Sequence, residues 1–196
     1  MRLAVGADTT KVLATLSSAF RADPVWAWIA PDPRTRASVH EALFAPSVEA
    51  AVVRKTLWVT DDVEAVAVYV PPGQPEVLAP DGLPPAESAW SHGLRMLGPH
   101  GTAVSELFDR FDKARPAVPE HFYLSLLGTH ESYRGRGVGM HLLRETLTQL
   151  DDDGHHVYLE STNPTNDARY HSVGFADFGE IVLPDGSARI RTMWRE

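Results

Sequence analysis

The spacing of apolar positions predicts helices in the first part of the chain. Apolar side chains recur every three or four residues over 12–20, as on one face of a helix, and Asp8 or Thr9 can cap the start of this helix. The next segment, 25–33, is aromatic but interrupted by proline, so it is predicted to be a loop that carries two indole rings. A second helix is expected around Val39, with Pro46 dividing it.

Alternation of apolar side chains then predicts two strands and a long connection. Residues 56–60 and 64–70 have the pattern of neighbouring strands with a tight turn between them. Residues 71–85 are rich in proline and glycine and show little periodicity, which is typical of a long loop. Helical spacing returns over 86–97 and 102–113.

The last third of the chain has the clearest pattern. Residues 121–128 form a nearly continuous apolar run, which is typical of a strand covered on both faces. A glycine-rich turn follows, and leucines at helical spacing then extend to Gly154. A further strand is expected over 155–161, a short helix behind the cap Asn163–Pro164, and two closing strands around a turn at 184–187.

Composition narrows the class of protein. A chain of 196 residues with 43% hydrophobic and 22% charged residues has enough apolar material for one core and is not disordered. The 26 acidic and 18 basic side chains give a formal net charge of −8, which disfavours general binding of nucleic acid and favours cationic small molecules. The absence of cysteine excludes disulfides, thiolate zinc sites and a cysteine nucleophile. No stretch resembles a secretion signal or a membrane span, so a soluble, cytoplasmic protein without a membrane partner is expected.

The turn at 134–139, Arg-Gly-Arg-Gly-Val-Gly, is suited to binding an anion. A strand, a glycine-rich turn and a helix in this order place free backbone N–H groups at a helix N-terminus, where the helix dipole favours negative charge. The glycines allow close approach, and the two arginines add charged donors. A phosphate or pyrophosphate site is therefore expected, although the spacing fits neither a P-loop nor a dinucleotide fingerprint. A tight turn without a ligand is the alternative.

This turn resembles the Arg/Gln-x-x-Gly-x-Gly/Ala motif of the GNAT superfamily of acyl-CoA N-acyltransferases. Leu127-Gly128-Thr129 before it, and Asn166, Tyr170 and Gly174-Phe175 after it, fall where that family has its pantetheine strand, cofactor asparagine, tyrosine and Gly-Phe pair. The likeness is dense over 121–175 and thin before it, and its second half is similar in particular to puromycin N-acetyltransferases.

The resemblance implies acetyl-CoA, or a close acyl-CoA, as co-substrate. The pyrophosphate would lie on the backbone of the glycine-rich turn, and the pantetheine arm would pair with the preceding strand as a peptide adds to a sheet. Asn166 would bond the arm or the nearby phosphates. The implied cofactor-binding residues are Leu127, Gly128, Thr129, Arg134, Gly135, Arg136, Gly137, Val138, Gly139, Met140 and Asn166.

Amide formation from a thioester needs a neutral amine, a group that stabilises the oxyanion, and a proton for the departing thiolate. With the family resemblance, Tyr170 is expected to give that proton, because a phenol with a pKa of about 10 can protonate a thiolate whose acid has a pKa of about 8.5. Without the resemblance, a packed aromatic residue is the better interpretation. A backbone N–H near Gly128 or Thr129 would hold the oxyanion.

The general base is the least defined part of this mechanism. Some family members carry a glutamate on the central strand, but 121–128 contains no carboxylate. Glu160 on the next strand is the best substitute, and a structural, hydrogen-bonded glutamate is an equally good interpretation. Weaker candidates are His121, Asp61, Asp62 and Glu64.

Histidines and tryptophans have ordinary interpretations. The nine histidines include no His-x-x-x-His pair on a clear helix, and His155 and His156 would face opposite sides of a strand, so no metal site is predicted. Tryptophans are more often core residues than ligand contacts. Trp26 and Trp28 are possible exceptions, because they lie in the variable half where this family builds its acceptor pockets.

The expected fold is thus a single-domain α/β fold of GNAT type, with a central mixed, twisted sheet flanked by helices and a cleft where two central strands part. Residues 1–120 would form the acceptor-side half, and 121–196 the acetyl-CoA-binding core. The expected activity is transfer of an acetyl group to a primary amine of a small molecule, and a homodimer is common in the superfamily.

Two other functions stay open. The missing central carboxylate favours a noncatalytic acyl-CoA-binding regulatory module, whereas the retained Tyr170 argues against it. An acetyltransferase of protein or peptide amines would need an open groove in place of a closed pocket. Whether Trp26, Trp28 and the loop 71–85 cover the cleft discriminates between a small-molecule and a peptide acceptor.

Overall fold

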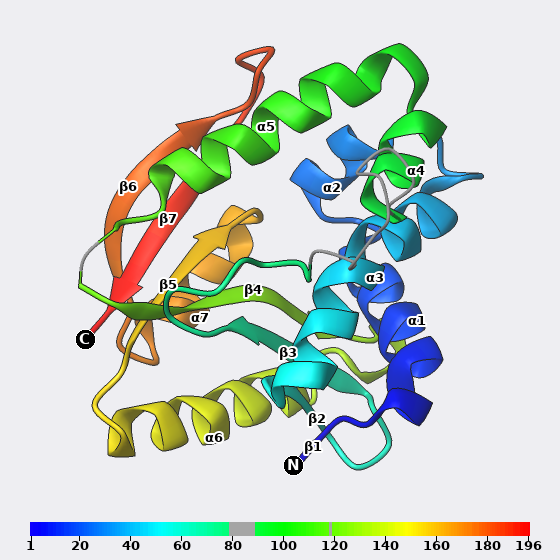
Figure 1. The fold of residues 1–196 in the computed structure, drawn as a ribbon. Coiled ribbons are helices and arrows are strands. Elements are labelled where there is room, and N and C mark those ends of the chain that lie inside the picture. The colour runs from blue at the N-terminus through cyan, green and yellow to red at the C-terminus, as the bar shows by residue number, and fades with distance from the viewer. Residues whose placement is uncertain (79–88, 118) are drawn as a thin grey trace.

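The computed structural model describes residues 1–78, 89–117 and 119–196, and at its centre lies a seven-stranded sheet (Figure 1). The strand order is β1-β2-β3-β4-β5-β7-β6, and neighbouring strands are antiparallel except β4 and β5, which run parallel. This mixed sheet confirms the expected α/β class. The strands are β1 (Arg2–Leu3), β2 (Leu57–Val59), β3 (Ala65–Val70), β4 (His121–Thr129), β5 (His156–Ser161), β6 (Ala176–Val182) and β7 (Arg189–Arg195).

Helices cover both faces of the sheet (Figure 1). Helices α1 and α3 pack against β3 and β4 on one face, where Leu16, Phe44 and Val66 share a buried core. Helix α6 packs on the other face, where Ala67 and Leu143 belong to a second core. The helices are α1 (Thr9–Phe20), α2 (Pro24–Ile29), α3 (Arg36–Arg54), α4 (Ala89–Met96), α5 (Gly101–Ala114), α6 (Val138–Asp152) and α7 (Asp167–His171).

Strands β4 and β5 separate soon after they begin. They pair only at His121–Tyr123 of β4, opposite residues 156–158 of β5, although β4 continues to Thr129 and β5 to Ser161. The expected parting of two central strands is therefore confirmed, and it leaves one edge of β4 free along most of its length.

A bulge in β4 lies beside this opening. Leu124 pairs with Tyr69 and Leu126 pairs with Val68, so Ser125 is an extra residue without a partner in β3. The bulge turns Leu124 and Leu126 into the cores on opposite faces of the sheet. It also places Ser125 at the wall of a cavity that is described below.

Two predictions for the first part of the chain are wrong. Residues 24–29 form helix α2, because Asp23 caps it by accepting hydrogen bonds from the backbone N of Val25 (3.0 Å) and Trp26 (3.1 Å), with proline at the first helical position. Helix α3 continues through Pro46, because the segments on both sides of this residue bury apolar side chains in the same core.

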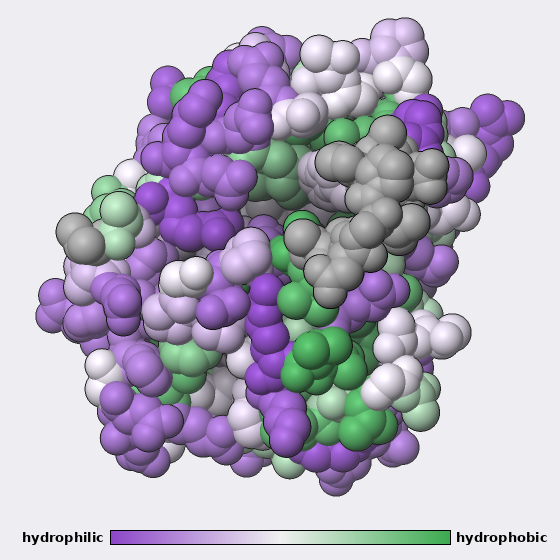
Figure 2. Space-filling view, in the orientation of Figure 1, coloured by the Kyte–Doolittle hydropathy of each residue, from purple (hydrophilic) through white to green (hydrophobic). Residues whose placement is uncertain are grey.

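The other predicted elements agree with the structure within a few residues where it describes them. Residues 79–85 of the expected loop and 86–88 of the expected helix lie outside the described residues. Figure 2 shows polar side chains over much of one face of the molecule, with apolar groups gathered on the side where α3 lies. Within the described ranges, no helix is both long and apolar enough to cross a membrane.

Candidate active site

The glycine-rich turn presents backbone N–H groups at the start of α6. Gly137 caps this helix with φ 76°, and Gly135 has φ 77°, a left-handed conformation that glycine adopts without strain. The first intrahelical bond runs from His141 N to Gly137 O at 2.9 Å. The preceding N–H groups of the first turn therefore have no partner within the helix and can bind an anion.

Gly139 allows this turn to lie against the end of β4. A Cβ atom built on Gly139 would lie 2.2 Å from Oγ1 of Thr129, which is far shorter than a van der Waals contact. A side chain at this position would push the start of α6 away from the free edge of β4. This close approach to the Thr129 hydroxyl favours glycine at position 139.

A cavity of about 620 Å³ lies between this turn, the end of β4 and α7. All the residues implied as cofactor-binding line it except Arg136, whose guanidinium lies 5.4 Å from the ring centre of Tyr133. Arg134 lines it and also donates from Nη2 to Ala19 O. Asn166 lines it as well, with its Oδ1 accepting from Arg169 Nη1 at 2.5 Å.

The free edge of β4 supplies backbone groups to the same cavity. His130 N donates to Glu64 O at 2.9 Å, on the side of β3. Because N–H groups alternate between the two edges of a strand, Gly128 faces β3 as His130 does, whereas Leu127 and Thr129 face the edge that β5 has left. Of the two candidate oxyanion donors, the alternation favours Thr129.

A second cavity of about 430 Å³ adjoins the first, and Tyr170 lines both. Burial raises the pKa of the Tyr170 phenol, and the negative charges of Asp23 and Asp167 raise it further, so the phenol is neutral and carries its proton. Its ring packs against Phe175 with 5.9 Å between ring centres. Tyr170 thus stands where the two cavities meet.

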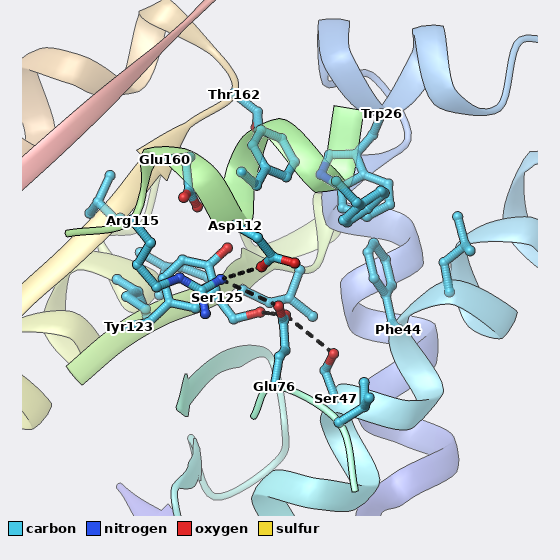
Figure 3. Close-up of a pocket in the computed structure, with 18 of the residues that line it drawn as sticks. Trp26, Phe44, Ser47, Glu76, Asp112, Arg115, Tyr123, Ser125, Glu160 and Thr162 are labelled. Carbon is cyan, nitrogen blue, oxygen red and sulfur yellow. Dashed lines mark hydrogen bonds and ion pairs between the residues drawn. The ribbon is translucent and has the colours of Figure 1, made fainter. Parts of the chain in front are cut away.

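Glu160 lies in the wall of this second cavity, on β5 (Figure 3). Burial raises its pKa to about 7, against the opposing effects of the Tyr123 and Tyr158 hydroxyls and the Arg115 guanidinium. Its Oε1 is shielded from solvent and has no hydrogen-bond partner in the described part of the chain. A carboxyl group with a pKa near neutrality can both accept and release a proton.

Residues 115–192 match the sequence profile of the Acetyltransferase (GNAT) domain. This part of the chain carries the GNAT match. This match contains the glycine-rich turn, Glu160 and Tyr170, and it supports an acyltransferase. Residues 1–114, which supply α1 to α5, lie outside it.

Solved acetyltransferases share the fold over nearly the whole chain. A polyamine N-acetyltransferase from Drosophila melanogaster is 17% identical, with a TM-score of 0.65 over 98% of this chain and 97% of its own. Arylalkylamine N-acetyltransferase 2 from Aedes aegypti is 14% identical, with a TM-score of 0.61 over 99% and 96%. A "histone acetyltransferase HPA2 and related acetyltransferase" from Corynebacterium glutamicum is 22% identical, with a TM-score of 0.60 over 98% and 92%.

Sequence reasoning missed a group of polar residues at the second cavity. Glu76, in the connection after β3, accepts hydrogen bonds through Oε1 from Ser125 Oγ and from Ser47 Oγ (3.3 Å; Figure 3). Nη2 of Arg115 lies 3.7 Å from Oε2 of Glu76 and 3.6 Å from Asp112 Oδ1. Glu76 thus brings a carboxylate to the central strand, which has none of its own.

The weaker candidates for a base lie elsewhere in the GNAT fold. His121 packs against Trp194 at 5.2 Å between ring centres, with Nδ1 3.0 Å from Pro119 O. Glu64 accepts from Thr60 Oγ1 at 2.5 Å. Neither these residues nor Asp61 and Asp62 line the two cavities.

Trp26 and Trp28, the two tryptophans singled out from the sequence, lie in different surroundings. Trp26 lines the second cavity and packs against Phe44 with 4.5 Å between ring centres. Trp28 donates from Nε1 to Asp185 Oδ2 at 2.7 Å and does not line either cavity. Among the described residues, no three histidine or acidic side chains gather in a way that could hold a metal ion.

Proposed function

We propose that this protein transfers the acetyl group of acetyl-CoA to a primary amine of a small, cationic molecule. The position of Tyr170 carries the proposal. Its phenol lies between a cavity built around backbone N–H groups and a cavity with acidic and aromatic walls. A proton donor at that junction is within reach of a thioester entering from one side and an amine entering from the other.

The first cavity is the proposed acetyl-CoA site. The N–H groups before His141 would hold the pyrophosphate, with Arg134 supplying positive charge. The free edge at Leu127 and Thr129 would pair with the amide groups of the pantetheine arm, as an added strand does. The close fit of Gly139 against Thr129 supports this assignment, because the turn and the strand edge must both face one ligand. In this proposal residues 121–196 form the donor half, and 1–120 supply most of the acceptor side.

The proposed reaction needs two proton transfers. Glu160, when ionised, takes a proton from the ammonium group directly or through water, and the neutral nitrogen attacks the thioester carbonyl carbon. The backbone N–H of Thr129 stabilises the oxygen as it gains negative charge. As the carbon–sulfur bond breaks, Tyr170 gives its proton to the thiolate and regains one from solvent, so that an amide and a free thiol result.

Several observations support a small amine as acceptor. The second cavity has a volume of about 430 Å³, within the range of small-molecule pockets, and Trp26 and residues 75–77 line part of its wall. Acidic side chains outnumber basic ones in its lining, which favours a cation. Structural relatives include acetyltransferases named for polyamines and for arylalkylamines. Glu160 and Glu76 also supply the carboxylates whose absence from the central strand favoured a noncatalytic module.

Release of free thiol from acetyl-CoA, measured with a panel of primary amines, tests this function. We expect turnover above the rate of hydrolysis with at least one small amine, and mass spectrometry should find the acetyl group on its nitrogen. Binding of acetyl-CoA without turnover across the panel would instead support the noncatalytic module. Turnover confined to peptides would support the protein acetyltransferase.

A further inference from the structure

The proposed acceptor cavity has two unlike walls (Figure 3). Phe44 and Trp26 lie on one side, and Glu160, Arg115 and Glu76 lie on the other. An occupant that matches both walls has a charged end and an apolar body.

The apolar wall is a continuous set of aromatic rings. Trp26 lies 4.5 Å from Phe44, 5.5 Å from Phe20 and 6.3 Å from Phe108, measured between ring centres. Phe108 in turn lies 4.5 Å from Trp90. All four pairs are tilted or edge-to-face, the arrangements that aromatic rings prefer, and another ring entering the cavity could extend the set in the same way.

In the charged wall, the carboxylate of Glu160 has no cation within ion-pair distance among the described residues, although the charge of Arg115 still acts on it. Arg115, the only basic residue among the described residues of the lining, approaches Glu76 and Asp112 and stacks 3.8 Å from the ring centre of Tyr123. Glu160 has no ion pair with a described residue, and Asp109 is exposed to solvent. The wall therefore offers Glu160, whose Oε1 is shielded and without a partner among the described residues, as the partner for one ammonium group.

A second positive charge on the occupant would meet either the aromatic wall or the exposed carboxylates of Asp109 and Asp112, where solvent weakens the attraction. Moving an ammonium group from water to an apolar surface without a carboxylate partner is unfavourable, and the cation–π attraction recovers only part of that cost. The cavity thus selects against amines with charges at both ends.

We infer that the acceptor is an arylalkylamine: one primary ammonium group, facing Glu160, on a short chain that ends in an aromatic ring against Phe108 and Trp26. This inference rests on the proposed acetyltransferase function and names its substrate class.

Three probes of similar length test the inference: 2-phenylethylamine, n-hexylamine and 1,4-diaminobutane. We expect kcat/KM for 2-phenylethylamine to exceed that for hexylamine by about tenfold, because two favourable ring contacts are together worth about 1.4 kcal/mol. The diamine should fall below both. Equal values for the two monoamines, or a preference for the diamine, would overturn the inference.

Phe108→Leu and Phe178→Leu form a matched pair of variants. Phe108 is partly exposed and lines the cavity, whereas Phe178 is 52% exposed on β6 and does not. F108L should raise the KM for 2-phenylethylamine about fivefold to tenfold while changing hexylamine and acetyl-CoA less than twofold. F178L should leave the KM values for 2-phenylethylamine, hexylamine and acetyl-CoA unchanged.

These outcomes distinguish a failure of the inferred arylalkylamine acceptor from a failure of the proposed acetyltransferase function. If F108L weakens both monoamines equally, the ring does not contact this wall and the inference is wrong. If F108L does not fold, the ranking of the three probes on the unaltered protein still decides. If acetyl-CoA binds but no amine of any kind is acetylated, the proposed function fails instead.

Discussion

Arg191 on β7 donates from Nε to Oδ2 of Asp167 at 2.9 Å, and Asp167 is the first residue of α7, the five-residue helix that carries Tyr170. Ser161 Oγ of β5 donates to the other oxygen of Asp167 at 2.6 Å. At the far end of α7, His171 Nε2 lies 2.7 Å from Oδ1 of Asp177, which also pairs with Arg191. Polar contacts therefore tie both ends of this short helix to the sheet.

Asp167 and Arg191 should act as positioning residues for Tyr170. A five-residue helix is not stable without tertiary contacts, so Asp167→Asn or Arg191→Gln should lower kcat by about tenfold and change the KM for acetyl-CoA little. Arg189→Gln is the control, since Arg189 lies on the same strand but pairs with the exposed Glu180 at 3.0 Å. In a Tyr170→Phe background, Asp167→Asn and Arg191→Gln should lower kcat no further. An additional loss there would show a role other than placing the phenol.

Tyr170→Phe removes the proposed proton donor and keeps the packed ring. Turnover should fall by about a hundredfold or more, because protonation of the thiolate then depends on water. The Kd for acetyl-CoA, measured by calorimetry, should stay within about twofold of the unaltered protein. An unchanged kcat would remove Tyr170 from the mechanism.

Activity should depend on pH through Glu160. Its pKa of about 7 means that kcat/KM for the amine rises as pH increases through 7, because only the ionised carboxylate accepts a proton. In Glu160→Gln, this rise of kcat/KM through pH 7 should be absent. Glu76→Gln should move its midpoint to lower pH, because the negative charge of Glu76 contributes to the raised pKa. A profile that keeps its step near pH 7 in E160Q would assign the base to another group.

The same carboxyl group should make the unaltered protein less stable at high pH. Because the pKa of Glu160 is higher in the folded protein than in the unfolded chain, its contribution is fully present below about pH 4.5 and is lost as pH rises through 7. Glu160→Gln stays neutral, so urea unfolding at pH 8 should find it about 1–3 kcal/mol more stable than the unaltered protein, with no difference at pH 4. If the two proteins differ in unfolding free energy by the same amount at pH 4 and at pH 8, the pKa of Glu160 is not raised.

Gly139→Ala tests the contact between the glycine-rich turn and β4. The new methyl group would overlap Oγ1 of Thr129, so the Kd for acetyl-CoA should rise by about tenfold or more. Combining it with Thr129→Ala removes that oxygen and should restore much of the binding. Gly6→Ala is the control, because nothing lies within 4 Å of a Cβ at Gly6. Tight binding by G139A alone would mean that the turn can shift freely.

The sequence predicted the helices, strands and turns of residues 121–175 well because their signals are local. Leucines at helical spacing, the Asn163–Pro164 cap and the glycine-rich turn each fix the structure of a few consecutive residues, and these segments are adjacent along the chain. The Asp23–Pro24 pair carried an equally local signal, since it is a cap followed by proline, but the prolines nearby favoured a loop. Helix α2 could thus have been predicted.

The acceptor side could not be predicted in the same way. Glu76 and Arg115 lie in proline-containing connections without periodicity, and Glu76 meets both Arg115 and, at the bulge of β4, Ser125. Such contacts depend on the packed fold and leave no trace in the spacing of residues. Continuation of α3 through Pro46 has the same origin, because burial on both sides of the proline outweighs the lost backbone bond.

The parting of β4 and β5 divides the sheet into two half-sheets that are joined by three residue pairs at one end. Strands β1–β4 form one half, and β5–β7 form the other. A ligand that bonds to the free edge of β4 and also contacts α7 would connect the two halves at their open end. Amide hydrogen exchange should then slow in both half-sheets together when acetyl-CoA is added, because the bound molecule would link the two half-sheets and stabilise both.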